Sequence, residues 1–164
     1  MDRRNFLHVV ACGALAAGMA GFLPGLAQAQ SAKFHVGVSL PEAQNPFYIA
    51  LGRSIQQTLE KAGFRVTLLS ANADVNEQVS NINDLVASKV DAILMSPLNT
   101  KGPAAAVQRA HAAGIPIFMT ARTLDDQYRS LWKTYVGFDY ADVGAKKGKW
   151  VVDSVKPGKI AMLL

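Results

Sequence analysis

The sequence predicts an α/β protein in which helices cover a doubly wound parallel sheet. After Ser31, short apolar and β-branched runs alternate with longer segments of helical period, which is typical of repeated β-α-β units. Units of this kind close with right-handed crossovers and place helices on the faces of the sheet. Stop signals follow the helical segments at Ala62-Gly63, at Ala113-Gly114 and at Pro157-Gly158.

Five short segments and the start of a sixth are expected to be strands, because each is an apolar run bounded by turn-forming residues. They are Phe34 to Leu40, Arg65 to Leu69, Val90 to Met95, Ile115 to Thr120, Tyr135 to Phe138 and Lys159 to Leu164. Ligands of such sheets bind at the carboxyl ends of the strands, beside the point where the strand order reverses. The loops that follow the strands are therefore the candidates for a binding site.

Four helices are expected between the strands, since apolar side chains recur there at three- and four-residue spacing. Their apolar faces are Leu51, Ile55, Leu59 and Ala62; Val75, Val79, Ile82 and Val86; Val107, Ala110 and Ala113; and Val143, Trp150, Val151 and Val155. Lys146, Lys147 and Lys149 fall on the last helix without interleaved aromatic residues. They predict a solvated face rather than a nucleic-acid platform.

Residues 1–29 are predicted to be a signal peptide. Arg3-Arg4 precedes an apolar stretch from Val9 to Leu26, and Ala27-Gln28-Ala29 offers a cleavage site of small residues. The arginine pair resembles the twin-arginine export signal of bacteria, which predicts a periplasmic protein cleaved near Ala29. A retained membrane anchor is the alternative, but Pro24 and the many small residues make this segment a poor membrane span.

Composition argues against several classes of function. The single cysteine, Cys12, lies in the predicted leader, so the mature chain has neither a disulfide nor a thiolate metal site. His35 and His111 lack carboxylate or cysteine neighbours at ligand spacing, so no metal site is expected. A net charge of +5 is mild and dispersed. No nucleophile elbow, zinc-protease motif or dinucleotide fingerprint is present, so no catalytic residue, enzyme activity or cofactor is expected.

The loop after the first expected strand carries an amide and two aromatic residues. Asn45 can donate and accept hydrogen bonds, and Phe47 and Tyr48 offer flat apolar faces, a mixture that suits the hydroxyls and C–H faces of a sugar or polyol. The same residues also fit a helix start, with Asn45 as cap, Pro46 at the first position and Phe47 in the core. From this loop alone the helix start is the simpler interpretation.

Five segments match one known family in order and spacing: Gly37 to Leu40, Asn45 to Tyr48, Asp91 to Pro97, Ala112 to Ile117 and Val136 to Asp139. In this series the chain resembles the ribose-type periplasmic sugar-binding proteins of ABC importers. The resemblance implies a type I periplasmic binding protein fold, with two flavodoxin-like lobes that close over the ligand. It also implies a receptor that performs no chemistry and delivers a sugar, polyol or similar small hydroxylated ligand to a membrane permease.

The resemblance implies six ligand-binding residues, and they are Asn45, Phe47, Tyr48, Ser96, Arg122 and Asp139. Asn45 is expected to bond ligand hydroxyls, Phe47 or Tyr48 to pack against the ring, and Arg122 to clamp sugar oxygens with its fork of donors.

Three positions depart from the family pattern, because Ser96, Ala121 and Tyr140 stand where the family has Asn, Asp and Asn. Without the carboxylate at position 121, a buried hydrogen bond to the ligand is unmade, which costs about 1 to 3 kcal/mol. We therefore expect a ligand other than ribose: a smaller polyol, a deoxy or modified sugar, or another small polar molecule. Asp125 or Asp126 could supply the acceptor, or could simply belong to a solvated loop.

By this resemblance, residues 30–133 form the N-terminal ligand-binding lobe, and residues 134–164 hold a hinge crossing and the start of a second lobe. The sequence stops inside an apolar strand, so we expect it to be truncated. The full-length protein is expected to be a monomer. An alternative with the same cleft is a periplasmic sensor that signals to a chemoreceptor or histidine kinase. An exported enzyme on a flavodoxin-like scaffold is poorly supported.

Overall fold

A five-stranded parallel sheet forms the centre of the described chain. The computed structural model describes residues 34–155, 158–159 and 161. The strands are β1 (His35–Leu40), β2 (Arg65–Ser70), β3 (Ala92–Met95), β4 (Ile117–Thr120) and β5 (Thr134–Val136). They pair in the order β2-β1-β3-β4-β5, and all four pairings are parallel. The predicted doubly wound α/β fold is therefore confirmed, and its strand order reverses between β1 and β3.

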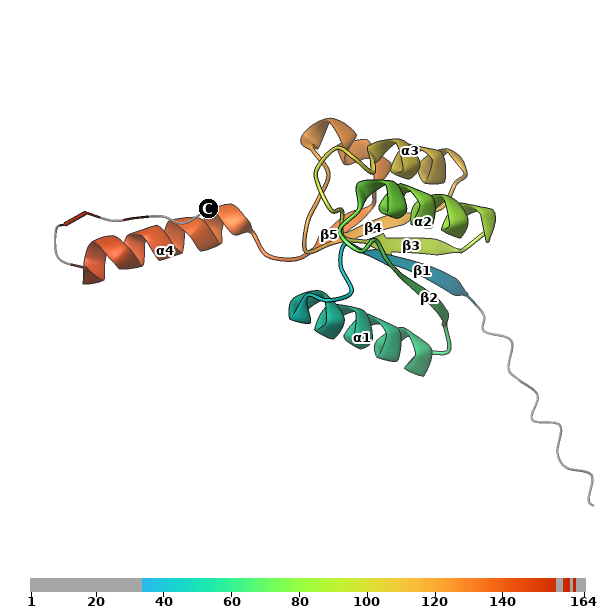
Figure 1. Ribbon diagram of the computed structural model, residues 1–164, viewed down its shortest axis with the longest axis horizontal. Coiled ribbons are helices and arrows are strands. Elements are labelled where there is room, and N and C mark those ends of the chain that lie inside the picture. The colour runs from blue at the N-terminus through green and yellow to red at the C-terminus, as the bar shows by residue number, and fades with distance from the viewer. Residues whose placement is uncertain (1–33, 156–157, 160, 162–164) are drawn as a thin grey trace, which may run out of the picture. The chain divides into compact units, whose positions relative to one another are not determined.

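Helices lie on both faces of this sheet. In chain order the helices of the described residues are α1 (Pro46–Lys61), α2 (Val75–Ala87), α3 (Ala104–Ala112) and α4 (Tyr140–Ser154), with a 3-10 helix, η1 (Asp126–Leu131), between β4 and β5. Of these, α1, α2 and α3 pack against strands of the sheet. Helix α1 packs against β1 and β2 on one face, whereas α2 and α3 pack together on the other (Figure 1). The four predicted helices are present, but η1 was not expected, because its sequence has no apolar period.

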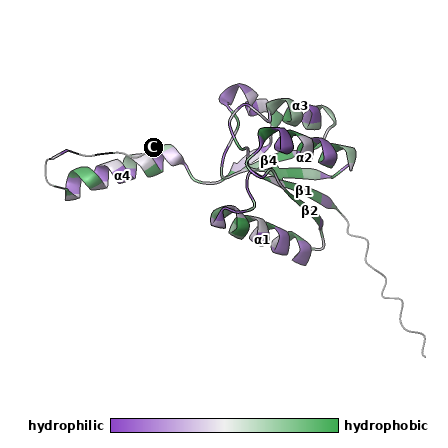
Figure 2. Ribbon diagram, viewed as in Figure 1, coloured by the Kyte–Doolittle hydropathy of each residue, from purple (hydrophilic) through white to green (hydrophobic). Residues whose placement is uncertain are grey.

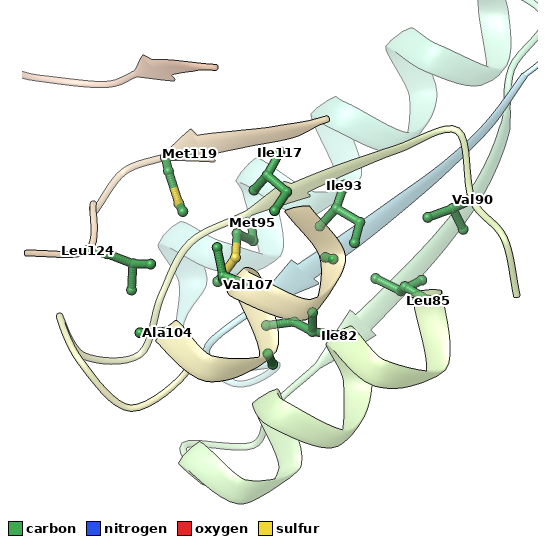
Figure 3. Packing of buried hydrophobic residues seen from close by; sticks show 12 residues of the cluster. Ile82, Leu85, Val90, Ile93, Met95, Ala104, Val107, Ile117, Met119 and Leu124 are labelled. Atoms are coloured by element: carbon green, nitrogen blue, oxygen red, sulfur yellow. The ribbon is translucent and has the colours of Figure 1, made fainter. Parts of the chain in front are cut away.

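The main core lies between the sheet and the α2–α3 pair. Ile93, Met95, Ile117 and Met119 project from β3 and β4 toward side chains of α2 and α3 (Figure 3). In Figure 2 green predominates on the central strand β3, while the helices carry both colours. The second cluster, under α1, contains Tyr48 and the β1 side chains Val36, Val38 and Leu40, so the β1 side chains of this cluster face α1.

Two strands begin later than their apolar runs predict. Val90 N donates to Leu85 O and Ile115 N donates to Ala110 O, so both amides close the preceding helix instead of joining the sheet. The structured strands therefore start at Ala92 and Ile117. The expected strand from Lys159 to Leu164 and the proline of the last stop signal fall largely outside the described residues, as does the predicted leader.

The predicted apolar faces are only partly buried. Val107, Ala110 and Ile82 are buried as expected, whereas Ala62 and Ala113 are exposed because they cap helix ends.

Helix α4 forms where expected but buries none of its described side chains, and Trp150 is 65% exposed. Its lysines form the predicted solvated face, with Lys146 and Lys149 each 2.7 Å from an Asp carboxylate one helical turn away. No helix in the described part of the chain is long and apolar enough to cross a membrane.

Candidate functional site

The predicted binding residues all lie at the carboxyl edge of the sheet. Asn45, Phe47 and Tyr48 follow β1, and Ser96 follows β3 on the other side of the point where the strand order reverses. Arg122 and Asp139 follow β4 and β5. Parallel strands bring these four loops to one edge, although the loops are distant in sequence.

Tyr48 and Ser96 meet across the point of strand reversal. The Tyr48 hydroxyl lies 3.3 Å from Ser96 Oγ, and the two residues are 4% and 0% exposed. A buried hydroxyl requires a partner, and each of these hydroxyls provides one for the other. The pair therefore joins α1 to the loop after β3 and forms the floor of this edge, so Tyr48 does not offer a free ring face.

Asn45 caps the start of α1, as the helix-start interpretation of its loop predicted. Its Oδ1 accepts a hydrogen bond from Phe47 N at 3.0 Å, so it is the N-cap of α1. This bond uses the side-chain oxygen and leaves the amide nitrogen to donate elsewhere. Phe47 is 47% exposed and meets Tyr48 edge to face at 5.0 Å between ring centroids. Phe47, rather than Tyr48, therefore has an accessible ring at this edge.

Arg122 is held by the loop after β3. Its Nη1 donates to Leu98 O at 3.0 Å, and its side chain lines a groove of about 930 Å³. A guanidinium carries five donors in one plane, so the single bond to Leu98 restrains the side chain and leaves donors for a ligand. This volume lies in the range of small-molecule sites.

The backbone before Arg122 is strained. Ala121 has a φ of 58°, a left-handed conformation that costs a residue with a Cβ about 1 to 2 kcal/mol. Arg122 N donates to Thr120 O at 2.6 Å and closes a three-residue turn around Ala121. Asp adopts this region more readily than most residues, which gives a backbone reason for an Asp at this position besides its acceptor oxygens.

Tyr135 ties the loops after β4 and β5 together. Its hydroxyl lies within hydrogen-bond distance of two carbonyls, Ala121 O at 3.2 Å and Phe138 O at 3.0 Å, and its single hydrogen can be donated to either. A Cβ on Gly137 would overlap the Tyr135 hydroxyl, so a glycine is needed for this close approach. Burial raises the pKa of Tyr135, and the nearby Tyr140 adds to the rise. The hydroxyl therefore stays protonated and able to donate at neutral pH.

Helix η1 and the residue that follows it supply further groups to the groove: Asp126 and Arg129 from η1, and Trp132 directly after it. The Arg129 guanidinium lies 4.0 Å from the centroid of the Trp132 ring. Of the two acids considered as replacement acceptors, Asp125 lies 3.7 Å from Lys101, whereas Asp126 lines the groove beside Arg122. Sequence patterns did not reveal Arg129 or Trp132, because no motif marks the segment that presents them.

Asp139 also lines the groove, but one of its oxygens is already used. Oδ1 accepts hydrogen bonds from Ala141 N and Asp142 N, both at 3.0 Å, and so caps α4. The second oxygen takes no part in this cap. The structure thus brings Arg122 and Asp139 to one groove and joins Tyr48 to Ser96, while Asn45 and Phe47 do not line that groove.

Comparisons with known proteins agree with this architecture. The family model described as a periplasmic binding protein domain matches residues 36–164. The ribose import binding protein of Bacillus subtilis is 29% identical over 132 residues, which cover 80% of this chain and 42% of that protein. The galactofuranose-binding protein of Escherichia coli is 28% identical, with 82% of this chain and 43% of that protein covered.

Solved structures give the same result. A crystal structure from Mycobacterium smegmatis in complex with β-D-fucofuranose is 30% identical with a TM-score of 0.69, and covers 76% of this chain and 42% of that one. The chain thus spans less than half the length of the relatives that it matches. Because the family model matches most of its length, the chain belongs to the periplasmic binding protein domain family. The relatives are named as binding proteins rather than enzymes.

Proposed function

We propose that this protein is a solute receptor that binds a sugar or similar small hydroxylated ligand at the carboxyl edge of the sheet and delivers it to the permease of an ABC importer. The observation that carries this proposal is the position of Arg122, which enters a groove from a strained turn with most of its donors unused by Leu98. The relatives described as ribose import and galactofuranose-binding proteins support a sugar as the ligand.

The domain arrangement is part of the same proposal. Residues 30–133 form the first lobe of the receptor, residues 134–164 hold a hinge crossing and the start of a second lobe, and residues 1–29 direct export to the periplasm. The full-length protein acts as a monomer. Asn45 donates to ligand hydroxyls, Phe47 packs against the ring, and Arg122 and Asp139 bond its oxygens, while Tyr48 and Ser96 support the floor.

A thermal-shift screen of the native gene product tests the ligand class. The panel contains D-ribose, L-arabinose, D-galactose and D-fructose, with L-leucine and L-glutamate as amino acids of comparable size. A sugar present at 100 times its Kd stabilises the folded state by about 2.7 kcal/mol, so we expect a saturable rise in Tm with at least one sugar. D-ribose should not be the strongest, because Ala121 lacks the acceptor oxygens. A rise with an amino acid and with no sugar would contradict the proposal.

Arg122→Lys separates the binding role of Arg122 from any structural one. Lysine keeps the charge but lacks the planar fork, so affinity for the best sugar of the panel should fall at least about tenfold, with Tm of the free protein nearly unchanged. The matched control is Arg109→Lys. The Arg109 guanidinium on α3 also makes one hydrogen bond, to Asn83 Oδ1 on α2 at 3.0 Å, but it does not line the groove. Equal sugar affinity in Arg122→Lys and wild type, measured by calorimetry, would remove Arg122 from the site.

A further inference from the structure

Gln78 is a fully buried polar side chain in the core face of α2. It is 0% exposed, at a position where the periodicity of the helix calls for an apolar residue. Both ends of its amide are bonded to backbone: Nε2 donates to Ser96 O at 2.9 Å, and Oε1 accepts from Leu98 N at 2.8 Å. Its polar atoms are thus satisfied by a single segment, the loop after β3.

The two bonds fix the backbone on either side of Pro97. The loop is further joined to β1, since Ser96 N donates to Ser39 O at 3.1 Å. Leu98 also contacts the ligand-site arginine. Its N–H donates to Gln78 Oε1, and its carbonyl accepts a hydrogen bond from Arg122 Nη1. Two hydrogen bonds that meet at Leu98, one at its N–H and one at its carbonyl, therefore link α2 to the guanidinium of Arg122.

We propose that Gln78 is a positioning residue for the ligand site, which sets the Leu98 carbonyl and through it the plane of the Arg122 guanidinium. Complete burial keeps Gln78 away from any ligand, so it acts only through the loop. This inference rests on the proposed function, since the orientation of Arg122 matters for binding only if Arg122 holds the ligand. Filling the core alone would not require an amide, because an apolar side chain of the same length fills the same space without a polar group.

Gln78→Glu is the sharpest variant, because glutamate has nearly the same shape. It keeps the acceptor for Leu98 N but places an oxygen opposite Ser96 O, where a donor is needed. Protonation restores an O–H donor, and burial raises the pKa of a carboxyl group. We expect sugar affinity to fall about tenfold at a pH of about 7.5 and to recover toward the wild-type value as the pH falls to about 5, with wild-type affinity nearly flat over this range.

The matched control is Asn81→Asp on the same helix. Asn81 Nδ2 donates to a backbone carbonyl at 2.8 Å, but that carbonyl belongs to Ser70 at the end of β2. The change from amide to acid is the same, yet it leaves Leu98 and Arg122 untouched. Affinity in Asn81→Asp should stay within about twofold of wild type and show no recovery at low pH.

Two further measurements distinguish positioning from general loss of stability. In native-state hydrogen exchange, the Leu98 amide should exchange faster in Gln78→Glu, because repulsion between the glutamate oxygen and Ser96 O displaces the loop although the acceptor for Leu98 N remains. The Ile93 amide in β3 should keep its wild-type rate. In an Arg122→Ala background, Gln78→Glu should cause little further loss of affinity, because its effect passes through Arg122. If Gln78→Glu does not fold at neutral pH, Gln78→Met, which has the same length and no charge, replaces it in both measurements.

The probes are the four sugars of the panel, each titrated with the native gene product. Wild-type affinity in Gln78→Glu at neutral pH, or the same loss with and without Arg122, would overturn the positioning role. If the wild-type protein binds none of the four sugars, the proposed function is wrong, but the positioning role of Gln78 can still be tested. The exchange rate of the Leu98 amide and the NMR shift of Arg122 Nε then decide the positioning role: a change in both supports it, and no change overturns it.

Discussion

At the scale of single residues, several side chains at this edge serve the fold and are available to a ligand at once. Asn45 caps α1 with its oxygen, Asp139 caps α4 with one of two oxygens, and Arg122 uses one donor on Leu98. In each case the structural bond fixes the side chain and leaves hydrogen-bonding capacity. A cap and a ligand contact are therefore compatible roles for Asn45, although its loop alone favours the cap.

Asn45→Asp separates these two roles. Aspartate caps helices as well as asparagine does but has no N–H to donate, so the free energy of unfolding should stay within about 0.5 kcal/mol while sugar affinity falls about tenfold. Asn45→Ala, which lacks the cap as well, should also lower the free energy of unfolding by about 1 kcal/mol. Urea denaturation and calorimetry measure the two quantities. Unchanged sugar affinity in both variants would leave Asn45 with the cap alone.

At the scale of elements, the helix ends show how well local signals predict structure. Gly63 and Gly114 follow α1 and α3 with φ of 83° and 77°, as their stop signals predict. Helix α2 ends in the same way, but Lys89 occupies the left-handed position with a φ of 51°. No sequence signal marks this end, because lysine is not a residue that favours such a conformation.

Lys89→Gly should therefore stabilise the protein. Relief of the left-handed strain exceeds the added entropy of the unfolded chain, so we expect the free energy of unfolding to rise by about 0.5 to 1 kcal/mol. Gly63→Ala is the converse, and it should lower this free energy by about 1 kcal/mol, because a Cβ there would meet nothing within 4 Å and only the backbone is affected. Urea denaturation measures both. A destabilised Lys89→Gly variant would show that the left-handed strain at Lys89 is smaller than the conformational entropy that glycine adds to the unfolded chain.

Sequence patterns predicted the fold more completely than the site. Alternating apolar runs were enough for the strands and helices, since burial on a parallel sheet leaves a strong periodic signal. The groove depends instead on η1 and on a three-residue turn at Ala121, neither of which leaves a periodic signal. Gln78 could have been found, because it lies on the same helix face as Ile82 and Leu85, and a polar residue on such a face needs partners.

At the scale of the whole molecule, the strand order explains why the predicted binding residues of four loops lie at one edge of the sheet. In the order β2-β1-β3-β4-β5, the direction of strand addition reverses between the paired strands β1 and β3. The helices on the two sides of this reversal lie on opposite faces of the sheet, as α1 and α2 do (Figure 1). The loops after β1 and β3 therefore diverge, and the Tyr48–Ser96 pair closes the floor between them. The fold supplies the edge, whereas the choice of ligand depends on the individual residues that it places there.

We propose that this edge holds a sugar through Asn45 and Arg122, and a side-chain NMR titration of the native gene product can detect both contacts in one experiment. The titrant is the sugar of the panel that gives the largest thermal shift. We predict that the Asn45 Nδ2 and Arg122 Nε resonances shift and saturate with one common Kd, while those of His35, at the amino edge of the sheet, stay in place. Saturable binding that leaves both Asn45 and Arg122 unchanged would contradict the account.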